Sequence, residues 1–501
     1  MTSPNSIPNR IGLAAVVLAC WPCCLAAGAD GRTIAAAGCD RQSVQRAIDK
    51  AADGDTVEVP AGQATWTTAS PTRPAVLIES KTIALKGAGI DKTVITDGTT
   101  VAWRDLLLWV NGPKPSRVTG FTFKGIKGRN RGAAAIAVHG SCVDWRIDHC
   151  KFDASPRGIW AYAGCFGVVD NCTFLGTGQG VVMKGAGPKS WERPLGLGLA
   201  EAVYIEDCTF VGGSAATDGY HGARFVFRHN TVIDTHVAQH GCDSGRYRST
   251  FSFEVYDNVM ENRSRASSLP RAMHFRGGTG VVFNNTLKGY AEGIDVANYR
   301  SSEKPVLRRL CSHWGPCDGK NPIDGNEEPN GYPAWDQIGR STRQIHEPLY
   351  QWNNKFNDKA ARINVSTDGQ HIKAGRDFHD GVRRPGYRPY AYPHPLRRQW
   401  PARPSSDGRP PGVPRSVKAR ALAAGAVELT WEASKGDRAA AGYRIWLDGH
   451  RVSTITDPNC CRYVFGRLRP AAGRHTFAVS ALDAAGSESD PRAPAAPGGE
   501  R

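Results

Sequence analysis

Several short apolar strands of the sequence end in a side chain that could take part in ionic or acid–base chemistry. These residues are His139, Tyr162, Lys184 and Arg276. Two places earlier, the strands carry Ala137, Trp160, Val182, His274 and Asp295. A lysine or arginine can hold a carboxylate, an imidazole or phenol can move a proton, and an aromatic ring can stack on a sugar. The pattern favours an outer surface that binds an anionic polysaccharide.

Two polar segments between these strands carry further groups of the same kinds. We expect 217–224 and 235–248 to be irregular insertions that lie beside the same surface. Their candidate residues are His221, Arg224, His236, His240, Asp243, Arg246 and Arg248. His236 and His240 have a spacing that would suit a metal ion if a helix aligned them. No helix is expected there, so the sequence leaves open whether these histidines bind a metal ion.

The strands that must position these groups repeat along the chain. When they are aligned on their last apolar residue, one position holds Cys150, Cys172, Cys208, Asn230, Asn258, Asn285 and Asn354. Alternate residues before that position are apolar, so each strand would bury one face. One coil cannot bury its own inner face, and only stacked coils of similar shape complete a core. The repeat therefore predicts a solenoid in which the asparagines form a hydrogen-bonded ladder and the cysteines are buried.

Each coil contains at least two strands joined by glycine-rich corners, which favours a right-handed parallel β-helix. Such a solenoid must be capped at its exposed end. The segment 43–62 fits a first cap, in which Ser43 would N-cap a helix with an apolar stripe and the strand 56–59 would follow. The residues of that stripe are Val44, Ala47, Ile48 and Ala51.

The opening AIDKAADGDTVEVPAG (47–62), together with the cysteine and asparagine strands, resembles the pectate-lyase-like β-helix superfamily. The resemblance covers residues 36 to 300 and is specific for the fold. That superfamily includes lyases, hydrolases, epimerases, esterases and non-catalytic adhesins, so the fold alone does not define a reaction. The resemblance also implies that cationic side chains take the base and carboxylate-binding roles, as in related β-helix lyases.

The N-terminal residues 1–29 are typical of an export signal. Arg10 provides the positive region, 11–19 is apolar, and Ala27-Gly28-Ala29 fits a cleavage site. Cys20 follows a stretch similar to a bacterial lipobox, so lipid anchoring through Cys20 is an alternative. No later stretch reaches 18 apolar residues, and no membrane span is expected. We expect a secreted, periplasmic or cell-surface protein.

We divide the remaining chain into a β-helix at 30–300, an irregular arm with one further coil at 301–400, a linker at 401–411 and a small domain at 412–496. The last segment has short alternating strands separated by Pro and Gly turns, which predict an immunoglobulin-like β-sandwich. It resembles a fibronectin type III module, with Trp431 and Tyr443 at core positions and His475 in place of the usual corner tyrosine. The fold class is thus all-β.

Charge and cysteine content restrict the partners. The formal net charge is +16, and export makes nucleic acid an improbable ligand and an anionic polymer a better one. We expect a monomer. Eleven cysteines follow the signal segment, and Cys311 and Cys317 are close enough in sequence to pair.

We therefore expect a polysaccharide lyase that cleaves a uronate-containing glycan by β-elimination. This reaction needs a group to neutralise the uronate carboxylate, a base and an acid. Lys184 is the expected base and Arg276 and Arg246 the neutralising groups. His240 or Tyr162 would deliver the proton, with Asp243 able to orient His240. The expected substrate-binding residues are His139, Trp160, His221, Arg224, Asp243, His274 and Asp295.

Two alternatives remain open at this stage. A glycoside hydrolase of the same fold would use a carboxylate pair, either Asp243 with Asp295 or Asp218 with Asp243. A non-catalytic glycan-binding or adhesion protein would use the coils as a spacer. A second outward column, Asp148, Asp170, Glu206, Arg228, Tyr256 and Asn284, places three carboxylates close together. Calcium or neighbouring arginines could neutralise them, and the arginines are favoured.

Overall fold

The computed structural model describes residues 31–68, 70, 72–102, 104–112, 115–126, 132–242, 247–264, 269–301, 304–397, 410–434, 439–466, 468, 474–483 and 487–494. The export segment with Cys20, and nearly all of the linker, lie outside these residues. Among the described residues, no helix is long and apolar enough to cross a membrane.

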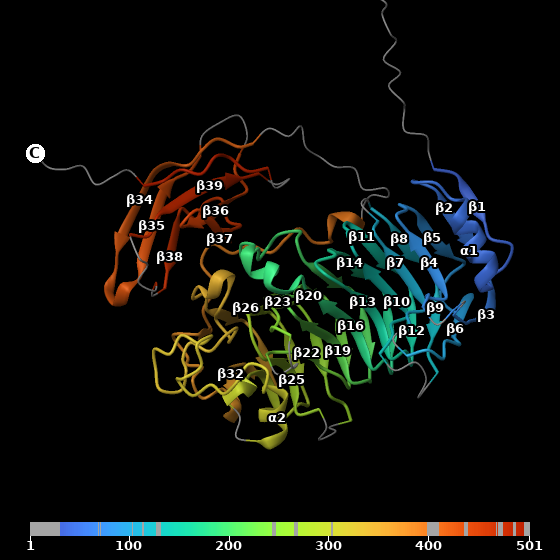
Figure 1. Cartoon of the computed structure of the whole chain (residues 1–501), viewed down its shortest axis with the longest axis horizontal. Helices are drawn as coiled ribbons and strands as arrows, with labels where there is room; N and C mark the ends of the chain where they lie inside the picture. The colour runs from blue at the N-terminus through green and yellow to red at the C-terminus, as the bar shows by residue number, and fades with distance from the viewer. Residues whose placement is uncertain are drawn as a thin grey trace, which may run out of the picture.

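Most of the described chain coils into three long sheets whose strands stack in parallel (Figure 1). The first sheet has twelve strands: β1 (Thr33–Ala35), β2 (Thr56–Val59), β5 (Ala84–Gly87), β8 (Arg117–Thr119), β11 (Trp145–Asp148), β14 (Gly167–Asp170), β17 (Val203–Glu206), β20 (Arg224–Arg228), β23 (Ser252–Tyr256), β26 (Thr279–Phe283), β29 (Leu349–Trp352) and β33 (Phe378–Asp380).

The second sheet has ten strands: β4 (Val76–Glu79), β7 (Leu107–Val110), β10 (Ile136–His139), β13 (Arg157–Ala161), β16 (Gln179–Lys184), β19 (Ala215–Tyr220), β22 (Val237–Gln239), β25 (Arg271–Phe275), β28 (Glu292–Val296) and β32 (Ile363–Val365). The third sheet has eleven: β3 (Gly62–Trp66), β6 (Thr93–Asp97), β9 (Thr122–Lys124), β12 (Lys151–Asp153), β15 (Thr173–Leu175), β18 (Thr209–Val211), β21 (Thr231–Ile233), β24 (Val259–Glu261), β27 (Thr286–Lys288), β30 (Lys355–Phe356) and the antiparallel β31 (Lys359–Ala360).

The interior of the coil is held by stacked side chains, as the repeat predicts. Asn258 Nδ2 donates to Asn285 Oδ1 at 2.8 Å, and Asn285 Nδ2 donates to Asn354 Oδ1 at 2.8 Å. The Cys208 amide donates to Asn230 Oδ1 at 2.9 Å, which joins the cysteine positions to the asparagine ladder. The cysteine and asparagine column is thus confirmed as one row of buried residues.

The first cap is helix α1 (Arg41–Lys50), which covers the first coils (Figure 1). Val44, Ala47 and Ile48 are buried, as expected. The predicted N-cap is wrong, because the helix begins one turn earlier than expected. Asp40 is the N-cap, and its carboxylate accepts a hydrogen bond from the Ser43 amide at 3.0 Å.

The two expected insertions are also wrong in part. Segments 215–220 and 237–239 form β19 and β22, which are regular members of the second sheet. Thr217 and Gly219 hide this regularity in the sequence, because they occupy the inward positions opposite the core residues Val181 and Met183. In the outward column of the first sheet, the position after Tyr256 is Phe283 rather than Asn284. Asn284 lies at the next corner, with φ 55°.

Short helices occur in the connections and near the C-terminal end of the solenoid. They are α2 (Pro305–Leu310) and the 3-10 helices η1 (Gly187–Glu192), η2 (Tyr299–Ser301), η3 (Thr342–Gln344), η4 (Thr367–Gly369), η5 (Pro395–Arg397) and η6 (Ala423–Gly425). Cys311 and Cys317 are buried free thiols, so the suggested disulfide is absent from the described structure.

The C-terminal domain consists of two three-stranded antiparallel sheets. One contains β34 (Arg415–Ala421), β35 (Val427–Glu432) and β38 (Arg462–Phe465), and the other contains β36 (Gly442–Leu447), β37 (His450–Ile455) and β39 (Phe477–Leu482). Trp431 and Tyr443 meet in its core with ring centroids 5.2 Å apart. The prediction of a parallel β-helix followed by a small β-sandwich is confirmed.

Residues 383–397 lie against the outer face of the first sheet. The Arg228 guanidinium donates to the carbonyl groups of Tyr390 and Ala391, both at 2.8 Å. Arg397 pairs with Glu206 at 2.9 Å. This arm therefore covers part of the outer face of the first sheet, whereas the outward residues predicted to form a site lie on the second sheet.

The buried carboxyl of Glu254 makes the attachment of this arm sensitive to pH. It accepts hydrogen bonds from the Tyr387 hydroxyl at 2.5 Å and from the Gly198 amide at 2.8 Å. Burial outweighs these bonds and raises the pKa of Glu254 to about 7, from an ordinary value of 4.5. The folded protein therefore holds this proton more tightly than the unfolded chain does.

We expect this contribution to stability to be complete below pH 4.5 and to be lost as the pH rises through about 7. Between pH 5 and pH 8, the free energy of unfolding of the wild type should fall by roughly 1–3 kcal/mol more than that of Glu254→Gln. Urea denaturation of both proteins at both pH values measures this. An identical pH dependence in the two proteins would contradict it.

Candidate active site

Six side chains form one row along the outer face of the second sheet. In coil order they are His139, Tyr162, Lys184, Tyr220, His240 and Arg276. Lys184 is the direct register partner of Tyr220, and the neighbouring pairs fix the other positions. Since parallel strands lie about 4.8 Å apart, the row spans about 24 Å, which is long enough for several sugar units.

The middle of this row forms a hollow with a volume of about 380 Å³. Its lining residues are Arg157, Trp160, Tyr162, Gln179, Val182, Lys184, Asp218, Tyr220, His240 and Tyr247. We call this hollow the groove. Apart from Tyr247, its side chains belong to β13, β16 and β19 or directly follow β13 and β22, so a rigid sheet positions them.

A chain of hydrogen bonds crosses four coils on the floor of the groove. Arg157 Nε donates to Gln179 Oε1 at 2.8 Å, and Gln179 Nε2 donates to Asp218 Oδ2. Asp218 Oδ1 lies 2.6 Å from His240 Nδ1. A carboxylate partner holds the imidazole proton on Nδ1 and leaves Nε2 as a proton acceptor. Asp218 therefore orients His240 as a base. The His240 side chain is 37% exposed and can meet a substrate, whereas that of Asp218 is only 7% exposed.

Aromatic rings line the groove around Lys184. The rings of Trp160 and Tyr162 stack with centroids 4.5 Å apart. Trp160 is buried, so the partly exposed Tyr162 is the ring of this pair that can stack on a sugar. Lys184 Nζ lies 4.8 Å from the Tyr247 ring centroid and 6.0 Å from that of Tyr162. The π faces stabilise the ammonium group, so Lys184 is suited to hold a carboxylate.

Burial controls the protonation of the other groups in the row. It raises the pKa of the Tyr162 and Tyr220 phenols, which therefore keep their protons at neutral pH. Nearby Asp105 for Tyr162, and Asp218 for Tyr220, act in the same direction. Burial and the Lys184 charge lower the pKa of His139, which stays neutral. The groove thus combines one oriented base, one cation and two phenolic acids.

Other expected residues lie at the ends of the groove or behind it. His139 stacks on Tyr162 with centroids 4.7 Å apart and extends the row at one end. Arg276 extends it at the other end, and its Nε donates to the Gln239 carbonyl at 2.7 Å. The His221 ring packs against Tyr247, with centroids 4.9 Å apart.

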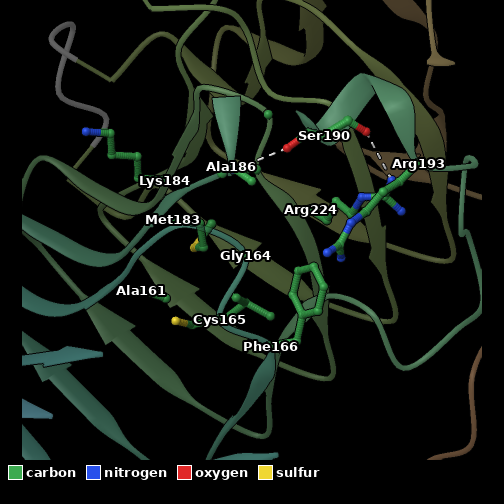
Figure 2. A pocket seen from close by; sticks show the side chains of 14 residues that line it. Ala161, Gly164, Cys165, Phe166, Met183, Lys184, Ala186, Ser190, Arg193 and Arg224 are labelled. Atoms are coloured by element: carbon green, nitrogen blue, oxygen red, sulfur yellow. Dashed lines mark hydrogen bonds between the residues drawn. The ribbon is translucent and has the colours of Figure 1, made fainter. Parts of the chain in front are cut away.

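Arg224 does not belong to the groove. It is buried and its guanidinium donates to the carbonyl groups of Ser190 and Pro194, at 3.4 and 2.9 Å. Lys184, Ser190, Arg193 and Arg224 all line a small cavity. Figure 2 shows the Lys184 side chain extending away from the other three. Arg224 therefore supports the η1 segment, and the expectation that it binds substrate is not met by its position.

His274 and Asp295 form a separate buried network beyond the groove. His274 Nδ1 lies 2.6 Å from Asp295 Oδ2, and its Nε2 lies 2.9 Å from the Tyr299 hydroxyl. Asp295 also pairs with Arg271 at 2.9 Å and accepts a hydrogen bond from Asn364. Asp243 and Arg246 lie outside the described residues. The predicted contact of Asp243 with His240 therefore stays a prediction, and within the described residues Asp218 contacts His240.

The two candidate cation sites do not fit a metal ion. His236 and His240 are separated by the extended strand β22, which places them about 13 Å apart along the strand. The carboxylates of the first sheet are paired with arginines: Asp148 with Arg117, Asp170 with Arg146, and Glu206 with Arg228. Within the described residues, no group of three or more His, Cys, Asp or Glu side chains is arranged to hold a metal. The arginines thus provide the neutralisation.

The residues missed by sequence reasoning are Arg157, Gln179, Tyr220 and Tyr247, together with the orienting role of Asp218. Tyr220 could have been found if AATDGY (215–220) had been aligned as a strand against QGVVMK (179–184), since it then falls opposite Lys184. Gln179 is the first residue of the second of these strands. No pattern marks Tyr247, which reaches the groove from a connection.

No protein-family model and no curated protein matches the sequence. Among solved structures, the PL6 family alginate lyase AlyGC is 14% identical with a TM-score of 0.32, over 69% of this chain and 52% of the lyase. The spore cortex lytic enzyme SleM of Clostridium perfringens is 18% identical with a TM-score of 0.15, over 17% of this chain and 27% of the enzyme. The chain thus spans about half the length of the lyase and about a quarter of the cortex enzyme. We draw no inference about activity from similarities this low.

Proposed function

We propose that the protein is an exported polysaccharide lyase that cleaves an anionic, uronate-containing glycan by β-elimination. The observation that carries this proposal is the oriented Asp218–His240 pair, which opens into an aromatic groove beside Lys184. The positive net charge of the whole protein supports an anionic polymer as the substrate. The proposal includes secretion, with lipid anchoring through Cys20 as the alternative, and a monomeric state.

The three roles that β-elimination requires, carboxylate binding, base and acid, would be taken by residues of neighbouring coils. Lys184 would bind the uronate carboxylate and stabilise the charge that develops when the adjacent C–H bond breaks. His240 Nε2 would accept that proton. The Tyr220 phenol lies between them in the row and would donate a proton to the departing glycosidic oxygen. The C–O bond breaks, a C=C bond forms in the uronate ring, and no further reactant is needed.

These roles differ from the sequence-based expectation for Lys184. Its Nζ faces the rings of Tyr247 and Tyr162, an arrangement suited to an ammonium group that holds a carboxylate. His240 has the orienting carboxylate that a catalytic base needs. Tyr162 and Arg276 then serve neighbouring sugar units, the first by stacking and the second by holding a further carboxylate.

A hydrolase would need two carboxyl groups on either side of the scissile bond. In the described groove, Asp218 is already hydrogen-bonded to both Gln179 and His240, and Asp295 lies buried in another network. The geometry therefore favours elimination. The position of His240 also supports turnover over simple binding, because its oriented imidazole lines the groove beside Tyr220 and Lys184.

The test is to incubate the mature protein with a panel of uronate polysaccharides. Ultraviolet absorbance of unsaturated uronate and new reducing ends are followed together. A rise in both supports the lyase. Reducing ends alone would establish the hydrolase, and binding without either product would establish a non-catalytic protein.

A further inference from the structure

A further cavity lies at the junction of the β-sandwich with residues 340–346, and its volume is about 220 Å³. Direct contacts fix its two walls. The Tyr463 hydroxyl of the sandwich donates to Glu347, which Arg384 also holds at 2.5 Å. The Leu195 amide donates to the Val452 carbonyl at 3.1 Å. The domain is therefore docked on the β-helix, and the cavity is preformed, as binding sites at domain junctions often are.

Basic and imidazole side chains enter the cavity from both walls. Arg340, Arg343 and His346 come from one wall, and His450 and His475 come from the sandwich. Some are already engaged: Arg340 donates to the Tyr332 hydroxyl at 3.0 Å, and His475 contacts Asp448 at 2.8 Å. Within the described chain, the side chains of Arg343 and His450 make no hydrogen bond or ion pair, and both are exposed. These two are available to a ligand.

The loop that carries Arg343 is held in an uncommon conformation. Arg343 and Gln344 have φ of 52° and 62°, in the left-handed region that disfavours residues with side chains. The Gln344 side chain anchors the loop, because its Oε1 accepts from the Asp336 amide at 2.9 Å and its Nε2 donates to Asp336 Oδ1 at 2.7 Å. Strain of this kind is concentrated at binding and catalytic sites.

The other lining groups indicate the kind of ligand. Ile345, Leu447 and Val452 provide apolar surface for the C–H face of a ring. Asp448 is occupied by His475 and the Thr476 amide, and Glu327 also lines the cavity. The cavity is smaller than the roughly 300–1,000 Å³ of sites for drug-sized molecules, which suits a single sugar ring.

We propose that this junction cavity binds one uronate unit of a glycan chain, with its carboxylate between Arg343 and His450. The choice of a uronate rests on the proposed function, whereas the cavity and its cationic lining do not. The site contributes nothing to bond cleavage. It would retain a long polymer while the groove acts on another part of the same or a neighbouring chain.

The test measures binding of D-glucuronate and D-galacturonate to the full-length protein by saturation-transfer NMR and calorimetry, with D-glucose and inorganic phosphate as comparison ligands. The variants are Arg343→Ala, His450→Ala and, as a charge control, Lys418→Ala on the exposed face of β34. Lys184→Ala removes any contribution from the groove. Thermal melts of all variants establish that each is folded.

The comparison is made in the Lys184→Ala background, where the groove no longer holds a uronate carboxylate. In that background we expect uronate affinity to fall at least tenfold when Arg343→Ala is added and several-fold when His450→Ala is added, and to stay unchanged when Lys418→Ala is added. Glucose should not bind at this site. Unchanged uronate affinity on adding Arg343→Ala in this background overturns the proposal, and so does phosphate binding as tight as uronate binding. Failure of the lyase assay with retained Arg343-dependent binding would reject the proposed function alone, whereas lyase activity with no such binding would reject the junction site alone.

Discussion

Replacement of His240 by alanine is expected to lower kcat by about 10²–10⁴-fold, which is the usual contribution of a positioned general base. KM should change little, because the aromatic platform and Lys184 remain. The fold should persist, since the Asp218 carboxylate keeps its hydrogen bond from Gln179. Initial rates of unsaturated-uronate formation, together with a thermal melt, measure both effects.

The chain offers a matched control for this variant. His149 makes the same kind of contact on the first sheet, where its Nδ1 lies 2.6 Å from the buried Asp148. His149→Ala should cost similar stability and leave kcat within about twofold of the wild type. Asp218→Asn should also lower kcat, because an amide no longer holds the imidazole proton on Nδ1. Wild-type turnover in His240→Ala would remove this residue from the mechanism.

Replacement of Lys184 by alanine is expected to lower kcat/KM by about 10²–10³-fold, comparable with the loss of one preorganised group that stabilises developing charge. Lys184→Arg should recover part of this loss, because a guanidinium also holds a carboxylate. Lys189→Ala, on the exposed surface of η1, is the control for a lost positive charge. Steady-state kinetics on a uronate polymer measure all three variants.

The arginine variant also separates the two possible roles of Lys184. An arginine cannot serve as the base at any working pH, so a fully inactive Lys184→Arg would favour the sequence-based assignment of Lys184 as the base. Partial activity in Lys184→Arg supports the neutralising role proposed above. Values of kcat/KM within threefold of the wild type in Lys184→Ala would contradict both roles.

Much of the fold could be predicted from the residues because its physical causes are periodic. The cysteine and asparagine positions return once per coil, and the alternation of apolar residues defines which face of each strand is inward. The same alternation correctly placed Tyr162, Lys184 and Arg276 in one outward row. It failed at 215–220, where Thr217 and Gly219 replace apolar residues at the inward positions. Pairing with the neighbouring strands on both sides maintains β19 there.

The sequence by itself determined the stacked coil, the row of Tyr162, Lys184 and Arg276, and the small C-terminal sandwich, because each follows from a local repeat of residue types. Only the tertiary structure decided that Asp218 orients His240 and that arginines from neighbouring coils neutralise the first-sheet carboxylates. The physical reason is that these contacts join residues of different coils at distances of about 3 Å, and such pairing depends on strand register, which no local pattern contains. The position of the sandwich on the β-helix was likewise decided only by the tertiary structure, since it depends on single contacts such as that of Tyr463 with Glu347.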